Sequence, residues 1–430
     1  MLLTRLDLRG SADPAAGLPR PSLGGAWEEA RPVEVVRAVL AEVRRRGDAA
    51  VREYTERFDR VAVDDLRVPG QDIAAALEAL PAPLREALAA ARDAIEAHHR
   101  TQLRPESEHE RDGVVIRELW RPVARAGCYV PGGRARYPST VLMTAVPARV
   151  AGVPEVVLCV PPGPDGFVPG VTLAAAALAG VDEVYRMGGA QAIAALAYGT
   201  ESVRPVDVIV GPGNVYVALA QREVAGEGVV GVPAAFAGPS EVVVVADETA
   251  PVDCAAIDVV VQAEHGPDGL AWLVTWSDGV ADAVTAAVER LVAAAPRRED
   301  IEATLRQGGY AVVVDGPEQA VAVANAIAPE HLELMVARAH ELLPLVRNAG
   351  VVFCGPFAPA AVGDYLAGPS HVLPTFGSAR FASGLRVDDF ARKIHAITLD
   401  AEALAFVAPH VAAIADAEGL AAHAQSVRLR

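Results

Sequence analysis

A glutamine and a histidine lie one helical turn apart at the end of an apolar helical pattern. Apolar residues recur at helical spacing over 251–265, so Gln262 and His265 share one face. Gly266 and Pro267 end this helix just beyond the pair, where the helix dipole favours a cation. The pair could therefore hold a metal ion or a charged ligand, although a single histidine near a helix end is more often a surface or capping residue.

Further polar residues interrupt apolar segments near the ends of expected strands and helices. They are Ser240, Glu330, His331, Asp364, Glu418 and His423. Asp364 and His423 could complete, with the helical pair, a set of nitrogen and oxygen ligands for one divalent ion. Glutamine is not among the usual zinc ligands, so this mixed set is less diagnostic than four cysteines.

The composition favours a soluble protein of two to three domains. The 430 residues are 52% hydrophobic, which is enough for sizeable cores, and the net charge is −17. An excess of acidic residues argues against nucleic acid or an anionic membrane as a partner. Residues 1–10 include Arg5, Asp7 and Arg9, so they resemble no signal peptide, and no apolar run reaches membrane-spanning length. We therefore expect a cytoplasmic protein.

Two residue types limit the chemistry further. Lys393 is the single lysine, which argues against a Walker A loop and against a Schiff-base enzyme. The four cysteines lack Cys-x-x-Cys spacing, and three lie in apolar runs. We therefore expect neither disulfides nor a thiolate zinc site.

Short apolar runs alternate with helical patterns over most of the chain. The first series of expected strands lies at 126–130, 155–160, 183–187 and 206–210, and a second series begins at 241. Such alternation requires right-handed crossovers between parallel strands. The expected fold class is therefore α/β, with two incomplete Rossmann-like parallel sheets covered by helices on both faces, a helical N-terminal section and a small helical C-terminal tail.

The same patterns suggest domain boundaries. We expect residues 1–126 and 239–376 to form one discontinuous α/β domain with the N-terminal helices, and 127–238 to form a second domain of nucleotide-binding type. Residues 377–430 would form a helical tail, which has too little apolar surface to fold alone and must dock on something. A long helical stretch is expected over 281–305, and a further helix is expected over 338–348.

Glycine-rich turns follow three strands of the first series. Ligands of parallel sheets bind beyond the carboxyl ends of the strands, where glycine lets the backbone approach closely. The dinucleotide fingerprint G-x-G-x-x-G is nevertheless absent, because Tyr216 stands where the third glycine of the Gly211 turn would be.

Eight short motifs occur in one order along nearly the whole chain. They are Tyr129–Gly133, Tyr137–Ser139, Gly188–Thr200, Gly211–Asn214, Ala237–Glu241, Gln262–Gly266, Pro329–Leu332 and His371–Thr375. With these motifs the chain resembles the histidinol dehydrogenases. One departure is Pro369-Ser370 before His371, where many members have an asparagine.

The resemblance implies a role for each candidate residue. The family's zinc ligands, one ion per subunit, fall on Gln262, His265, Asp364 and His423, and its acid/base pair falls on Glu330 and His331. Its substrate contacts fall on Ser240, Gln262, His265, His331, Asp364, Glu418 and His423. Its NAD contacts fall on Tyr129, Gln191 and Asn214, which makes 127–238 the NAD side.

The implied reaction takes L-histidinol to L-histidine through the aldehyde, with two NAD reduced. A neutral His331 with an ordinary pKa near 6.5 would accept the hydroxyl proton, and Glu330 would take a proton from water in the second step. The resemblance also implies a homodimer in which Glu418 and His423 reach the partner's site. These two residues diverge by about 140° on a continuous helix, so a bend between them is expected.

Two other functions compete with this interpretation. A cysteine-dependent aldehyde dehydrogenase would need an accessible, activated thiol, for which Cys128 is the single candidate. A metal-dependent binding protein with two α/β lobes would be expected to carry an export signal.

Overall fold

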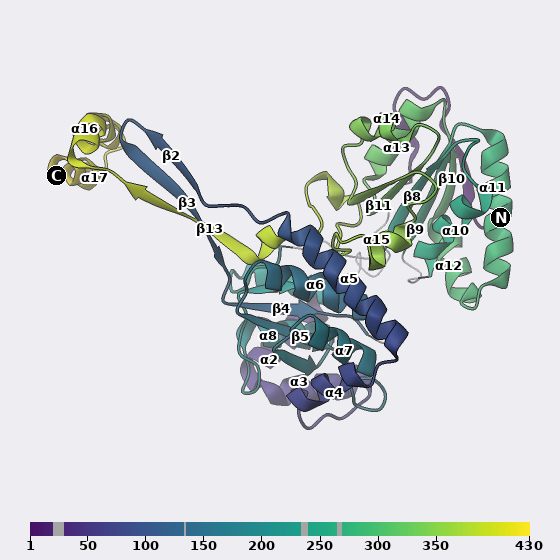
Figure 1. Cartoon of the computed structure of the whole chain (residues 1–430), viewed down its shortest axis with the longest axis horizontal. Helices are drawn as coiled ribbons and strands as arrows, with labels where there is room; N and C mark the ends of the chain where they lie inside the picture. Colours follow the sequence, from purple (N-terminus) through teal and green to yellow (C-terminus); the bar gives the residue numbers. More distant parts are fainter. Residues whose placement is uncertain (20–29, 133–134, 234–239, 265–268) are drawn as a thin grey trace.

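The computed structural model describes residues 1–19, 30–132, 135–233, 240–264 and 269–430. These residues form two α/β lobes and an extended arm that projects away from both (Figure 1). We name them the six-stranded lobe, the four-stranded lobe and the arm. None of the helices described is long and apolar enough to cross a bilayer.

The six-stranded lobe contains one parallel sheet in the order β1-β10-β9-β8-β11-β12. Its strands are β1 (Thr4–Asp7), β8 (Glu241–Ala246), β9 (Leu270–Thr275), β10 (Gly309–Val313), β11 (His331–Met335) and β12 (Val351–Cys354). Its helices are α10 (Val252–Ala263), α11 (Asp278–Ala294), α12 (Arg298–Gly308), α13 (Pro317–Ile327), α14 (Ala339–Leu342) and α15 (Ala360–Tyr365), with 3-10 turns η1 (Pro14–Gly17) and η2 (Leu343–Leu345).

Both faces of this sheet are buried. Val242 and Val244 pack with α10, α11 and α12 on one face, whereas Val243 and Val245 pack with α13 on the other. Burial on both faces explains why β8 is a continuous apolar run rather than an alternating one.

The four-stranded lobe is built around a parallel sheet in the order β6-β5-β4-β7. Its strands are β4 (Arg125–Tyr129), β5 (Glu155–Val160), β6 (Glu183–Arg186) and β7 (Val208–Val210), and the helices between and after them are α6 (Pro138–Val150), α7 (Gly170–Leu178), α8 (Gly189–Tyr198) and α9 (Val215–Gly226). The N-terminal helices α2 (Ala30–Arg46), α3 (Asp48–Asp59), α4 (Gly70–Glu78) and α5 (Ala82–Arg100) also belong to this lobe.

The position of the N-terminal helices differs from the expected grouping of 1–126 with 239–376. Ile95 of α5 is buried with Leu142 of α6, and Val36 of α2 is buried with Ile193 of α8. The first strand, β1, does belong to the six-stranded lobe, because it pairs with β10 at the edge of that sheet. A helical apolar stripe shows that a helix buries one face, but it does not identify the sheet against which it packs.

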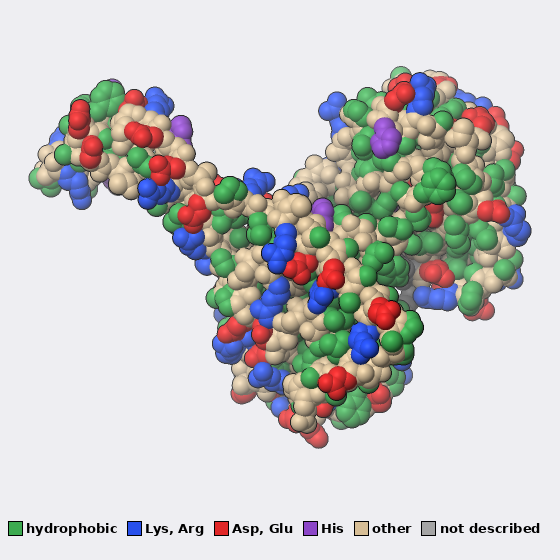
Figure 2. All heavy atoms as spheres, in the orientation of Figure 1, with side chains coloured by type: hydrophobic (Ala, Val, Ile, Leu, Met, Phe, Trp, Pro, Cys, Tyr) green, Lys and Arg blue, Asp and Glu red, His purple; other side chains and the backbone are tan. Residues whose placement is uncertain are grey.

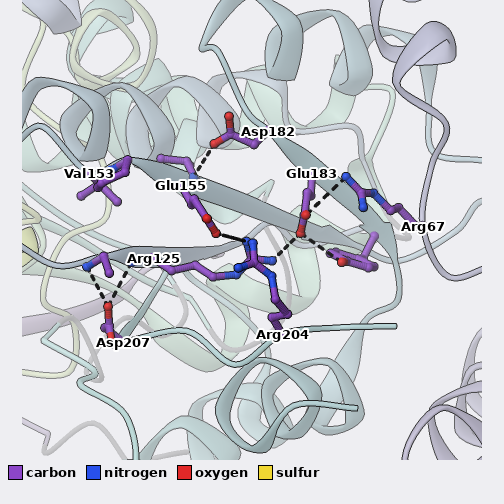
Figure 3. A network of polar contacts seen from close by, with 12 residues as sticks. Arg67, Arg125, Val153, Glu155, Asp182, Glu183, Arg204 and Asp207 are labelled. Atoms are coloured by element: carbon purple, nitrogen blue, oxygen red, sulfur yellow. Dashed lines mark hydrogen bonds and ion pairs between the residues drawn. The ribbon is translucent and has the colours of Figure 1, made fainter. Parts of the chain in front are cut away.

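Ion pairs hold together the amino ends of the strands in the four-stranded lobe (Figure 3). Arg125 is only 5% exposed and donates to Glu155 at 2.5 Å and to Glu183. Arg204 also donates to Glu155 at 2.5 Å, and the hydroxyl of Tyr185 donates to Glu183 at 3.0 Å. This edge of the sheet is therefore structural, which leaves the carboxyl edge for a ligand.

The arm corrects the expectation of a purely helical tail. It contains an antiparallel sheet of β2 (Ser107–Arg111), β3 (Val114–Pro122) and β13 (Ala391–Thr398), followed by α16 (Ala401–Ala417) and α17 (Ala421–Arg428). The 3-10 turns η3 (Ser378–Arg380) and η4 (Val387–Phe390) precede β13. Most side chains of β13 are exposed, so its sequence lacks the alternation that marks a half-buried strand.

Proline accounts for two further differences. The helix expected over 281–305 is interrupted between α11 and α12, where Pro296 cannot continue the backbone hydrogen bonding. Pro344 similarly limits the helix expected after residue 338 to α14 and the short turn η2. The α/β class itself, with two parallel sheets flanked by helices, is confirmed.

Candidate active site

Glu330 and His331 lie at the amino edge of the six-stranded sheet, where β11 begins beside β8. The backbone N–H of Glu241 donates to Oε2 of Glu330 at 2.9 Å. Nδ1 of His331 lies 3.1 Å from the carbonyl oxygen of Glu241. A carbonyl only accepts, so Nδ1 carries the hydrogen of this bond and Nε2 faces away from β8.

Two carboxylates and one aromatic ring surround His331. Its Nε2 lies 3.5 Å from Oδ1 of Asp364, and its Nδ1 lies 3.5 Å from Oε2 of Glu330. The imidazole stacks on Phe353 with centroids 6.1 Å apart. Burial disfavours the charged ring, but Glu330 and Asp364 outweigh it and raise the pKa of His331 to about 10. This pKa lies above the ordinary value near 6.5 that we expected for a neutral ring from the sequence.

The side-chain amide of Gln262 is buried. The side chain is 1% exposed, and neither atom of its amide has a hydrogen-bond partner among the residues that the structure describes. The backbones of Ser240 and Gln262 both approach Gly269. A Cβ atom built on this glycine would lie 3.1 Å from the carbonyl oxygen of Ser240 and 3.6 Å from the carbonyl oxygen of Gln262. Because unpaired buried amides are rare, this one fits a group that binds a ligand. His265 lies outside the described residues.

Glu418 and His423 are far from these groups within one chain. Glu418 caps the end of α16 and His423 lies in α17, both at the end of the arm opposite the six-stranded lobe (Figure 1). Within the described part of the chain, no cluster of three or more His, Cys, Asp or Glu side chains could hold a metal ion. Within one chain, Glu330 and Asp364 contact His331, and the backbones of Ser240 and Gln262 approach the same glycine, whereas the two residues of the arm lie elsewhere.

A cavity of about 930 Å³ opens at the carboxyl edge of the four-stranded sheet. All three expected NAD contacts line it: Tyr129 at the end of β4, Gln191 at the start of α8, and Asn214 at the N-cap of α9. The Tyr129 hydroxyl accepts a hydrogen bond from the N–H of Gly189 at 3.1 Å. Both amide atoms of Gln191 are buried and, within the described part of the chain, have no hydrogen-bond partner, as is also true of Gln262.

The turn after β7 shows why glycine is needed at this edge. Gly211 has a φ of +118°, and a Cβ there would lie 2.0 Å from the carbonyl oxygen of Tyr129. The glycine thus allows close approach of β7 to β4 at the rim of the cavity. Asn214 then begins α9 by accepting from the N–H groups of Tyr216 and Val217.

Comparisons with known proteins agree with this geometry. The sequence model of the family described as histidinol dehydrogenase matches residues 26–430. The chain belongs to the histidinol dehydrogenase family. It is 50% identical over 399 residues to the histidinol dehydrogenase of Parasynechococcus marenigrum (strain WH8102), a match that covers 92% of this chain and 90% of the relative.

Further relatives of the family support the assignment over the full length. The histidinol dehydrogenase of Moorella thermoacetica is 50% identical over 398 residues, covering 92% of this chain and 93% of the relative. The crystal structure of histidinol dehydrogenase from Elizabethkingia anophelis matches with a TM-score of 0.93 at 33% identity, covering 100% of this chain and 98% of that one. The chain is therefore an NAD-dependent oxidoreductase of histidine biosynthesis.

Family membership and burial together remove the cysteine-dependent alternative. Cys128 is completely buried, and this burial raises the pKa of its thiol to about 12. A buried, protonated thiol cannot act as the accessible nucleophile that such an enzyme needs. The expected absence of disulfides agrees with the four cysteines, which are all free.

Two residues that line this cavity were not indicated by any pattern in the sequence. Phe58 and Asp59, at the end of α3, line the cavity, and Oδ2 of Asp59 is buried with no hydrogen-bond partner among the described residues. The N-terminal helices were expected on the other lobe, so no pattern connected these residues with Tyr129 or Gln191.

Proposed function

We propose that this histidinol dehydrogenase performs both oxidations, L-histidinol to the aldehyde and the aldehyde to L-histidine, at one zinc-dependent site. The observation that carries this proposal is the contact of His331 Nε2 with Oδ1 of Asp364, with Glu330 on the other side of the ring. This places two proton-transferring groups beside an acidic ligand residue. Two NAD would accept the two hydrides in turn.

The residues at the amino edge of the sheet fit a zinc ion. Asp364 supplies a carboxylate and Gln262 supplies a buried amide that lacks a partner. His265 would be the third ligand, and His423 of a second copy the fourth. When bound, zinc would orient the imidazole and amine of histidinol and polarise the reacting oxygen.

His331 and Glu330 would divide the proton transfers between them. In the first step a hydride leaves the alcohol carbon for NAD, and Nε2 of His331 takes the hydroxyl proton once the bound ligands offset the charge of Asp364. In the second step water adds to the aldehyde carbon, Glu330 takes the water proton, and a second hydride leaves. Ser240 would hold the substrate from the start of β8.

The cavity of the four-stranded lobe would receive NAD. Tyr129, Gln191 and Asn214 line it at the amino ends of α8 and α9, where backbone N–H groups favour phosphate. The buried, unpaired amide of Gln191 can both donate to and accept from a carboxamide or ribose group.

The arm supports a homodimer with exchanged tails. Phe406, Val411, Ile414 and Leu420 are exposed on it, and its own core consists of little more than Ala412, Ala415 and Ala424 (Figure 2 shows hydrophobic side chains on its surface). A second exposed apolar group lies around α15, beside Asp364. It comprises Phe357, Val362, Tyr365 and Leu366.

A twofold exchange would cover both apolar surfaces and bring Glu418 and His423 to the partner's site. A break in the helix lies between these residues, because Glu418, Gly419 and Leu420 separate α16 from α17. We also propose a cytoplasmic location, which agrees with four free cysteines.

An assay of the purified enzyme tests the proposed function. Histidinol and NAD should yield two NADH per histidinol consumed, and removal of metal by a chelator should abolish this activity until zinc is restored. A thiol-blocking reagent should leave the rate unchanged. Full activity after complete metal removal, or one NADH per histidinol with free aldehyde as product, would contradict the proposal.

A further inference from the structure

His371 connects the two lobes through its imidazole ring. Nδ1 lies 3.0 Å from the carbonyl oxygen of Asp364, in α15 of the six-stranded lobe. Nε2 lies 3.0 Å from Oγ1 of Thr140, in the first turn of α6 in the four-stranded lobe. The proposed function assigns no role to either His371 or Thr140.

The chemistry of these partners defines the direction of both hydrogen bonds. The Asp364 carbonyl can only accept, so Nδ1 of His371 carries the hydrogen. In the neutral ring Nε2 is then an acceptor, and the hydroxyl of Thr140 donates to it. The ring therefore accepts from one lobe and donates to the other.

The backbone next to His371 is anchored to the four-stranded lobe. The Ser370 hydroxyl donates to the carbonyl oxygen of Met143 in α6 at 2.9 Å, and the N–H of Val372 donates to Ser370 Oγ at 3.2 Å. The Val372 side chain is buried in the core of that lobe. His371 is thus held by the lobe that carries the dinucleotide cavity, which Tyr137 lines three residues before Thr140.

Helix α15, in contrast, has little packing of its own. It has six residues, of which Ala360 alone is buried, and a helix of this length is not stable in isolation. Its first N–H, at Ala360, donates to Glu333 at 3.0 Å, and a Cβ at Gly363 would lie 2.5 Å from Phe353. Both of these contacts are made within the six-stranded lobe, by residues that precede Asp364 in the chain. The bond from His371 restrains Asp364 itself.

We propose that Thr140 and His371 are positioning residues that hold the carboxylate of Asp364 in its zinc-binding place from the opposite lobe. This inference rests on the proposed function, in which Asp364 is a zinc ligand. Without the two hydrogen bonds, Asp364 would keep its side chain but sample more positions, so zinc would bind more weakly. Partners that orient metal ligands typically change metal affinity by about 10- to 100-fold.

The test measures the zinc dissociation constant of the full-length protein by competition with a chelator, without substrate or NAD. Thr140→Val keeps the shape and removes the hydroxyl, and His371→Phe removes both ring nitrogens. Both should weaken zinc binding by about tenfold or more. Thr140→Ser retains the hydroxyl and should bind zinc as the wild type does.

Thr144→Val is the matched control. Thr144 is a buried threonine one turn further along α6, and its hydroxyl donates to the carbonyl oxygens of Thr140 and Val141 rather than to the other lobe. Its zinc affinity should be unchanged, and thermal unfolding of each metal-free variant should show that it is folded.

Three results would overturn the proposal. Wild-type zinc affinity in folded Thr140→Val and His371→Phe would remove the positioning role alone. An equal loss in Thr144→Val would assign the effect to the packing of α6. A wild-type protein that binds no zinc would overturn both this inference and the metal assignment on which it rests.

Discussion

Oε2 of Glu330 accepts a hydrogen bond from the backbone N–H of Glu241 at 2.9 Å, so the first peptide of β8 orients the carboxylate beside His331. Because the donor is a backbone group, the orientation does not depend on another side chain. An amide oxygen at position 330 could accept the same bond. A Glu330→Gln variant should therefore keep the geometry and lose the proton acceptor.

The proposed division of proton transfers predicts different effects for two variants. Glu330→Gln should slow oxidation of added histidinaldehyde by about 100- to 10,000-fold and affect the first hydride transfer much less. His331→Asn should slow both steps. Single-turnover measurements of NADH with histidinol and with the aldehyde separate the steps. Wild-type aldehyde oxidation by Glu330→Gln would show that Glu330 does not activate water.

The unpaired amide of Gln262 predicts opposite effects on stability and metal binding. Gln262→Leu removes a buried polar group that has no partner, so the metal-free variant should be more stable by about 1–3 kcal/mol. The same change should weaken zinc binding, because the amide is a proposed ligand. Denaturant unfolding without metal and zinc titration measure the two quantities. If metal-free Gln262→Leu were less stable than the wild type, the amide of Gln262 would contribute to stability without a ligand, which would contradict this interpretation.

Because the carboxyl group of Asp59 is partly buried, we expect its ionisation to make the stability of the folded protein depend on pH. Burial raises its pKa from 3.8 to about 6, and a carboxyl group with a raised pKa stabilises the fold at pH values below its unfolded pKa. That contribution is lost as the pH rises through 6. Asp59→Asn should therefore raise the Tm at pH 8 and change it less at pH 4.5, in protein free of NAD.

Asp165 provides the control for this pH dependence. It lines the same cavity but is exposed, and its Oδ1 accepts from the N–H of Phe167 at 3.1 Å. Because the Asp165 side chain is exposed, Asp165→Asn should change the Tm at pH 8 much less than Asp59→Asn does. A gain for Asp59→Asn that is the same at both pH values would argue against ionisation as its cause.

The ion pairs around Arg125 predict a large loss of stability. Arg125→Met would leave the carboxylates of Glu155 and Glu183 without their buried partner, at a cost of about 3–5 kcal/mol. Arg204 pairs with Glu155 from a position that is 64% exposed, so Arg204→Met should cost no more than about 1 kcal/mol. Denaturant unfolding of both variants makes the comparison, and equal losses would contradict it.

Local patterns were sufficient for much of the α/β core. The strand expected at 155–160 coincides with β5 (Glu155–Val160), and the second series of strands begins with β8 at Glu241, as expected. Each of these elements is bounded by turn residues and buried in a way that its own sequence displays. Strand β13 is different, because its partner β3 lies some 270 residues earlier and its own side chains are mostly exposed.

The candidate sites show the same distinction between local and long-range information. Tyr129 ends β4, Gln191 follows β6 and Asn214 follows β7 of one parallel sheet, so their common cavity could be anticipated from topology. Asp59 and His371 could not be placed in this way. Each reaches its site through packing between segments that are distant in the sequence, and no periodic pattern encodes that packing.

The proposed active site is composite, which requires that residues of two chains meet at each zinc ion. His423 lies on the arm and His265 belongs to the segment after α10, so each single variant, His423→Asn or His265→Asn, should be inactive on its own. If the two variants are unfolded and refolded together, half of the dimers are mixed. Each mixed dimer has one site in which both histidines are wild type.

The most direct measurement is therefore the activity of this co-refolded mixture, compared with each variant refolded alone. Exchange of the arm predicts recovery of about a quarter of the wild-type rate, because half of the dimers would carry one of two intact sites. The recovered activity should co-purify with the mixed dimer when the two variants carry different affinity tags. A mixture as inactive as its separate components, despite formation of mixed dimers, would show that each site is built within one chain and would contradict the exchange.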